Sequence, residues 1–159
     1  MTTIRRRTAA AALAVAAIGG TIVAVTAAAA PASAATTISF TEHNISDQTF
    51  NLGSGHGFAV GYVELVANKL MQGGRQIGHD GQSYTVTRLG NGSADELVSA
   101  VEVLPHGQID LSGLVTSTPS GPGTFRLAVT GGTGNYQDAR GYATLVPGNT
   151  PTVTIYLTP

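Results

Sequence analysis

Hydrophobic and polar residues alternate along several short segments of this 159-residue chain. In residues 152–158, Val153, Ile155 and Leu157 share one face, and threonines with one tyrosine occupy the other. Residues 108–115 and 124–130 follow the same rule. A period of two is typical of β-strands that bury one face and expose the other, so these segments are predicted to be strands.

Two further segments, residues 83–89 and 96–104, also have the composition of strands. The second is apolar on both faces except at Glu102, which suggests that both faces are covered, for example by a neighbouring subunit. Only residues 62–72 carry a pattern that would suit an amphipathic helix in isolation.

Glycine, proline, asparagine and aspartate interrupt these segments at short intervals and predict turns. They gather at residues 52–57, 73–74, 90–92, 105–107, 119–123, 131–134 and 147–151. About eight strands without crossover helices imply an antiparallel meander, which a sandwich or a barrel would both satisfy. We predict a closed antiparallel β-barrel of about eight strands, because closure pairs every strand edge in a chain that has no cysteine.

The segment 38–47 raises a question about one acidic residue. Read with a period of two, Ile38, Phe40 and Glu42 share a face, and Asn44 follows on that face. Glu42 either marks a strand end that has reached water, or it projects into the mouth of the barrel. In the second case burial would raise its pKa unless a donor pairs with it. The amide of Asn44 could then bridge to the carboxylate or hold a water molecule.

The first 34 residues have the pattern of a secretory signal peptide. Three arginines at 5–7 precede a long apolar run, and Ala32-Ser33-Ala34 forms a small-residue cleavage site. A retained anchor helix is the alternative, because the apolar run is long enough to span a bilayer. We therefore predict a leader at 1–34, a single domain at 35–159, and a secreted protein without a stable membrane anchor after processing.

The charge and motif content exclude several function classes. After the leader the chain has five basic residues against nine acidic residues, a net charge of 5 − 9 = −4, so nucleic acid is not expected as a partner. The glycines at 131–134 lack the spacing of a phosphate-binding loop and predict a tight turn. No histidine pair has zinc-like spacing, and we expect neither a metal site nor a cofactor.

Four stretches of the domain carry a family resemblance. Residues 42–47 resemble the pattern E-x-N-x-x-D, and 61–70 resemble a G-D-…-N-K-L segment in which Tyr62 replaces the aspartate. Residues 107–113 resemble G-x-I-x-x-x-G, and 127–134 with Arg140-Gly141 resemble L-A-V-T-G-G-T/S-G…R-G. The domain thus resembles the allene oxide cyclase and dirigent barrels over about 38–145.

The resemblance implies a fold and a set of site residues. It implies an eight-stranded antiparallel barrel that often assembles as a homotrimer. In the cyclases, a hydrophobic cup holds a fatty-acid epoxide while its ring closes with one handedness. A carboxylate stabilises the developing cation and asparagines position a water molecule. Glu42, Asn44 and Asn68 stand at the matching positions, so the resemblance implies that these three residues are catalytic.

This sequence also departs from the family. The cyclase cysteine falls on Ser83 and the cyclase tyrosine on Val115, which alters the shape and polarity of a pocket that Tyr62 and Tyr84 would also line. The dirigent motif H-D-I reads His43-Asn44-Ile45 here, without its aspartate. We predict a barrel that binds a small hydrophobic molecule and steers its stereoselective cyclisation in the manner of an isomerase. The alternative is a non-catalytic ligand carrier or a dirigent-type extracellular interaction protein.

Overall fold

The computed structural model describes residues 35–55 and 58–158, and the predicted leader at 1–34 lies outside them. Nine strands and one short 3₁₀ helix make up the described chain. They are β1 (Thr36–Asn51), β2 (Tyr62–Gln72), β3 (Arg75–Gly90), β4 (Ser93–Leu104), β5 (Gly107–Thr118), β6 (Gly121–Pro122), β7 (Phe125–Gly132), η1 (Gly134–Tyr136), β8 (Arg140–Val146) and β9 (Thr152–Thr158).

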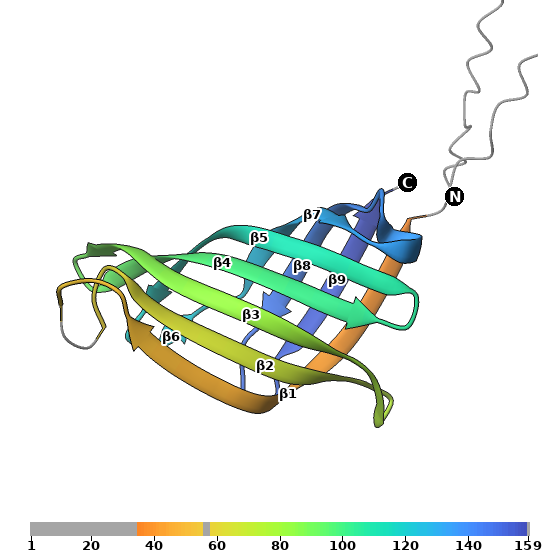
Figure 1. Ribbon diagram of the computed structural model, residues 1–159, viewed down its shortest axis with the longest axis horizontal. Helices are drawn as coiled ribbons and strands as arrows, with labels where there is room; N and C mark the ends of the chain where they lie inside the picture. Colours follow the sequence, from red (N-terminus) through yellow and green to blue (C-terminus); the bar gives the residue numbers. More distant parts are fainter. Residues whose placement is uncertain (1–34, 56–57, 159) are drawn as a thin grey trace, which may run out of the picture. The chain divides into compact units, whose positions relative to one another are not determined.

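The eight long strands form a closed antiparallel barrel, as predicted. Their order is β4-β3-β2-β1-β9-β8-β7-β5, and a further β4–β5 pairing closes the circle. Figure 1 shows β2, β3 and β4 crossing in front of β8 and β9. The two-residue β6 only extends the β5 end of the sheet. Every long strand therefore has two hydrogen-bonded neighbours, which stabilises the fold without disulfide bonds.

The alternating pattern decides which side chains fill the lumen. The inward residues of β5, β7 and β9 include Leu111, Leu127 and Ile155, all almost fully buried in one apolar cluster. Residues 62–72 form the strand β2, because Val63 and Leu70 gain burial in a sheet paired on both sides to β1 and β3. The helical pattern of this segment gives way to tertiary packing, as strand propensity depends on context.

Two glycines in the stretches that carry the family resemblance are required by the backbone geometry of the barrel. Gly141 has φ +137° and lies so close to the backbone oxygen of Tyr156 that a Cβ atom would overlap it. Gly107 has φ +143°, and a Cβ atom there would overlap the backbone oxygen of Thr133 in the same way. Only glycine tolerates both the conformation and the close approach, so these residues shape the barrel.

The lumen is not apolar throughout. Beyond the apolar cluster, buried polar side chains continue on the inward faces of β1 to β4, and they include Glu42, Asn68, Asp80, Gln82 and Glu102. A cavity opens beyond Glu42, on the side that faces away from Phe40. No helix in the described part of the chain is long and apolar enough to cross a membrane.

Candidate functional site

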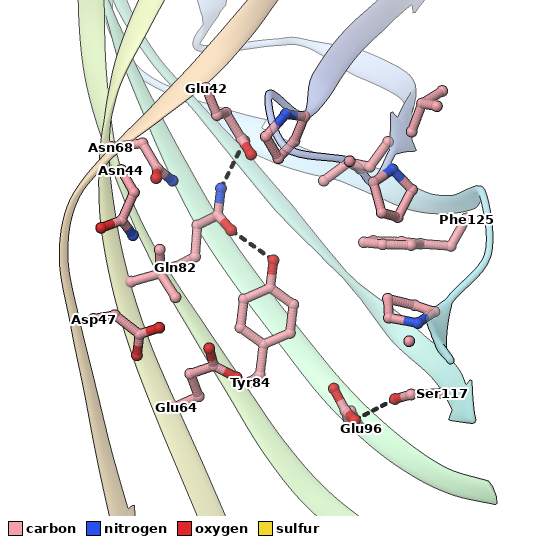
Figure 2. A pocket seen from close by; sticks show the side chains of 18 of the residues that line it. Glu42, Asn44, Asp47, Glu64, Asn68, Gln82, Tyr84, Glu96, Ser117 and Phe125 are labelled. Carbon is pink, nitrogen blue, oxygen red and sulfur yellow. Dashed lines mark hydrogen bonds between the residues drawn. The ribbon is translucent and has the colours of Figure 1, made fainter. Parts of the chain in front are cut away.

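Glu42 projects into the barrel from the middle of β1. Its side chain is only 6% exposed, because the strand continues past it to Asn51 and does not end in water. The Nε2 atom of Gln82, on β3, donates a hydrogen bond of 2.7 Å to its carboxylate. Figure 2 shows this contact at one end of the pocket. The face that Ile38, Phe40 and Glu42 share is therefore the inward face.

Gln82 connects Glu42 to the rest of a buried hydrogen-bond network. Its Nε2 atom also donates to Asp80 at 2.8 Å, and its Oε1 atom accepts from the Tyr84 hydroxyl at 2.6 Å. Asn68, on β2, donates to Asp80 from its backbone at 2.9 Å and from its side chain at 3.0 Å. Because the amide of Gln82 bonds to Glu42, Asp80 and Tyr84, the network fixes Glu42 and Tyr84 in place.

The environment of Glu42 gives its carboxyl a pKa suited to proton transfer. Burial, followed by the nearby charge of Asp80, raises the pKa of Glu42 from 4.5 to about 7, against the hydrogen bond from Gln82, which lowers it. Burial and the charge of Glu42 also raise the pKa of Tyr84 well above its usual range. At neutral pH Glu42 is therefore close to half ionised, while Tyr84 remains a hydroxyl donor.

A third carboxyl group, that of Glu102, lies close to those of Glu42 and Asp80. Glu102, on β4, is fully buried, and neither of its carboxyl oxygens has a hydrogen-bond partner among the described residues. Burial raises its pKa well above the ordinary value, with contributions from the charges of Asp80 and Glu42. Glu42, Asp80 and Glu102 each have a carboxyl oxygen within 4.8 Å of the others, so these three residues could hold a metal ion. Oxygen ligands of this kind suit a hard cation such as Ca²⁺.

A pocket of about 830 Å³ opens from Glu42 toward one end of the barrel. Its apolar lining includes Phe58, Phe125 and Leu145, and Val66 lies between Glu64 and Asn68 on the inward face of β2. In Figure 2, Phe125 lies across the pocket from the polar residues of β1, β2 and β3. A cavity of this size that combines apolar surface with polar side chains is typical of a site for a small organic molecule.

A second acidic group lies nearer the mouth of the pocket. Asp47, Glu64 and Glu96 all line it, on β1, β2 and β4. Burial, with the charges of Asp47 and Glu96, raises the pKa of Glu64. Glu96 accepts a hydrogen bond from the Ser117 hydroxyl, which Figure 2 marks. The polar wall therefore carries carboxyl groups along its whole length.

The predicted catalytic residues lie near one another but make different contacts from those expected. Glu42, Asn44 and Asn68 all line the pocket. Asn44 is exposed and donates to the backbone oxygen of Ser46 at 3.3 Å, so its amide does not bridge to Glu42. Asn68 is buried and is committed to Asp80. Gln82 makes the contact with Glu42 that was expected of Asn44.

The four predicted ligand-binding residues divide between two environments. Tyr84 lines the pocket, and Tyr62 packs against the pocket residue Phe58 with ring centroids 5.3 Å apart. Val115 is buried in the apolar cluster and does not line the pocket. Ser83 lies on the opposite face of β3 from Gln82 and Tyr84, because successive residues of a strand alternate sides, and it also lies outside the pocket.

Several site residues were missed, although the sequence holds a signal for some of them. Glu102 is the one charged residue in the run of residues 97–104, which is otherwise almost entirely apolar, and this exception marks it. The alternation of the predicted strand at 83–89 can be continued back to residue 80. It then places Asp80, Gln82 and Tyr84 on one face of the strand. A polar face of this kind is typical of a strand face exposed to solvent, so Asp80 and Gln82 were not predicted as site residues. Nothing in the local pattern of Phe125 or Glu64 distinguishes them from ordinary strand residues.

Comparison with known protein families identifies the family of this domain. Residues 35–156 match the family model described as allene oxide cyclase barrel like domain. None of the curated proteins matches the sequence.

Solved structures with the same fold include proteins of different activities. A pyocyanin demethylase is 26% identical, with a TM-score of 0.68 over 77% of this chain and 100% of its own. A pterocarpan synthase dirigent protein is 15% identical, with a TM-score of 0.62 over 80% of this chain and 96% of its own. The Diels Alderase AbmU from Streptomyces koyangensis is 14% identical, with a TM-score of 0.61 over 78% of this chain and 69% of its own.

Proposed function

We propose, from the premise that the chain belongs to the allene oxide cyclase barrel like domain family, that the barrel binds a small, largely apolar molecule and steers its cyclisation or a related rearrangement. The observation that carries the proposal is the position of Glu42. It is a buried carboxyl with a pKa of about 7 at the wall of an 830 Å³ pocket. A pocket that combines apolar surface with such a group at its polar wall suits chemistry on an organic ligand.

The geometry gives each residue a role in that chemistry. Phe58, Phe125 and Leu145 hold the apolar body of the ligand in one conformation, and this restriction supplies much of the rate enhancement in a cyclisation. Glu42 accepts or returns a proton, or stabilises positive charge that develops on the ligand. The hydroxyl of Tyr84 and the amide of Asn44 contact polar atoms of the ligand.

The similar structures support a small-molecule function of this kind. One is described as a pyocyanin demethylase, another as a dirigent protein of pterocarpan synthesis, and a third as a Diels Alderase. The first two descriptions name an organic compound, and the third names a reaction between organic molecules. Secretion, and assembly of this barrel as a homotrimer, remain predictions from the sequence.

A pocket-filling variant tests the proposal through the molecules that copurify with the protein. Gly148 lines the pocket, and a Cβ atom added there would meet nothing within 4 Å. The Gly148→Trp variant should therefore fold normally while its indole occupies the ligand site. Mass spectrometry of extracts from the purified protein should reveal an organic molecule in the wild type that is depleted at least about tenfold in the variant, which corresponds to a loss of about 1.4 kcal/mol of binding free energy.

The matched control is Gly81→Trp. Gly81 is exposed on the outer face of β3, outside the pocket, and a Cβ atom there also meets nothing within 4 Å. This variant should retain the molecule. Equal retention by both tryptophan variants would contradict a ligand site in the pocket.

A further inference from the structure

Acidic and basic side chains are separated between the inside and the outside of the barrel. The chain has nine acidic residues. Six of them face the lumen or line the pocket, and these are Glu42, Asp47, Glu64, Asp80, Glu96 and Glu102. The five lysines and arginines after residue 34 are all exposed, and they are Lys69, Arg75, Arg88, Arg126 and Arg140. Apart from the exposed His43, no described residue that lines the pocket is basic.

These interior carboxyl groups have no positive partner in the described structure. Amides and a hydroxyl donate to three of them: Gln82 donates to Glu42 and Asp80, and Ser117 donates to Glu96. Glu102 is fully buried and has no hydrogen-bond partner among the described residues, and one of its carboxyl oxygens lies within 4.8 Å of a carboxyl oxygen of Glu42. A buried carboxylate without a positive partner is costly, and a positive charge in the pocket would stabilise the ionised form of the carboxyl groups that line it.

The remaining wall of the pocket indicates what carries that charge. Phe58 and Phe125 present aromatic surface, and Val66 and Leu145 present aliphatic surface, around a cavity of about 830 Å³. An inorganic ion would leave this apolar surface and most of the volume unused. An aromatic cation would fill the cavity, with its ring system on the apolar wall and its charge toward the carboxyl groups. Contact between a cation and the face of a phenylalanine is itself favourable.

We therefore propose that the pocket selects organic cations, and that its ligand is a flat aromatic or polycyclic molecule with a positively charged nitrogen. This inference rests on the proposed function, because it names the ligand class of the same pocket. A fatty-acid epoxide, which the family resemblance would suggest, carries a carboxylate that this acidic wall repels. The low-dielectric walls concentrate the field of the carboxyl groups, so the preference for positive charge is strong.

Three probes with the same ring system and different charge test the inference. N-methylacridinium is a fixed cation, acridine is neutral at about pH 8, and acridine-9-carboxylate is an anion. Binding to the purified protein is measured by fluorescence titration. The cation should bind at least about tenfold more tightly than acridine, and acridine more tightly than the anion. The advantage of the cation should shrink when the salt concentration is raised, because salt screens the carboxyl groups near the mouth.

The double variant Asp47→Asn, Glu64→Gln removes two carboxyl groups of the polar wall and should reduce the preference for the cation at least about threefold. The control Asp138→Asn removes the same kind of charge from an exposed residue outside the pocket and should leave the preference unchanged.

Two adverse results have different meanings. If acridine or its carboxylate binds as tightly as N-methylacridinium, the preference for cations is wrong while the ligand-binding function stands. If none of the three probes binds, both the cation preference and ligand binding in this pocket are contradicted.

Discussion

Glu42→Gln is expected to reduce general-base catalysis in the pocket at least about 100-fold while leaving the barrel folded. The reporter reaction is the ring opening of 5-nitrobenzisoxazole. A base removes the proton on C3, the N–O bond breaks, and the electron pair ends on the oxygen of a coloured nitrophenolate. The reaction needs only a carboxylate in an apolar site, so it tests Glu42 without knowledge of the natural ligand.

The expectation follows from the environment of Glu42. Its carboxyl lines the pocket and its pKa is about 7, so at neutral pH a large fraction is an ionised base that is poorly solvated. Glutamine has nearly the same shape and can still accept the hydrogen bond from Gln82, but it cannot take a proton. The wild-type rate should rise with pH and level off above about pH 7, because only the ionised carboxyl reacts.

The exposed Asp138→Asn variant is the control for an unspecific loss of negative charge, and it should keep the wild-type rate. Circular dichroism checks that Glu42→Gln is folded. A variant that opens the benzisoxazole as fast as the wild type would remove Glu42 from proton transfer.

The free energy of unfolding is expected to fall as the pH rises from about 4.5 to about 7. In this window the folded protein keeps a proton on Glu42 that the unfolded chain has already lost, so raising the pH favours the unfolded chain. At about 1.4 kcal/mol per pKa unit, the difference between 4.5 and about 7 corresponds to a loss of about 3 kcal/mol. Above about pH 7 the contribution of Glu42 is constant, since both states are ionised.

Other groups that face Glu42 affect the size of this change. Asp80, Gln82 and Tyr84 lie on β3, Asn68 on β2 and Glu102 on β4. The raised pKa of Glu102 destabilises the fold at high pH in the same direction as that of Glu42. Tyr84 stays protonated across this window and adds no slope.

Urea unfolding at about pH 5 and about pH 8 measures the effect. Glu42→Gln should lose the part of the difference between the two pH values that is due to Glu42, because its side chain does not titrate. Glu102→Met is the comparison variant: it removes the other buried carboxyl with little change in volume and should retain the part due to Glu42. A wild-type stability that increases with pH over this range would have the wrong sign for a buried carboxyl of raised pKa.

The alternation of residues predicted the strands, and the absence of cysteine favoured a closed barrel over a sandwich. Val153, Ile155 and the face of Phe40 and Glu42 all lie inward, as the period of two requires. The segment 62–72 remained ambiguous because its apolar spacing fits a helix and a strand equally, and only pairing with β1 and β3 resolves it.

The candidate site could be predicted only in part. The alternation in residues 38–47 and the resemblance both singled out Glu42, but the partners of Glu42 come from other strands whose register no local pattern fixes. Gln82 reaches Glu42 across 40 residues of sequence, and Asp80 looks like any exposed strand residue until the barrel closes around it. Buried polar residues break the rule that polar faces meet solvent, so pattern analysis assigns them to the surface. Such exceptions are expected at functional sites.

The ionisation of Glu42 can be observed directly by ¹³C NMR of the side-chain carboxyl groups in protein labelled at glutamate. The resonance of Glu42 is the one that disappears in Glu42→Gln. If the barrel holds this side chain in its buried pocket, the resonance titrates with a midpoint at about pH 7. A midpoint near 4.5, the value of a carboxyl in water, would contradict both the buried position of Glu42 and the chemistry proposed for it.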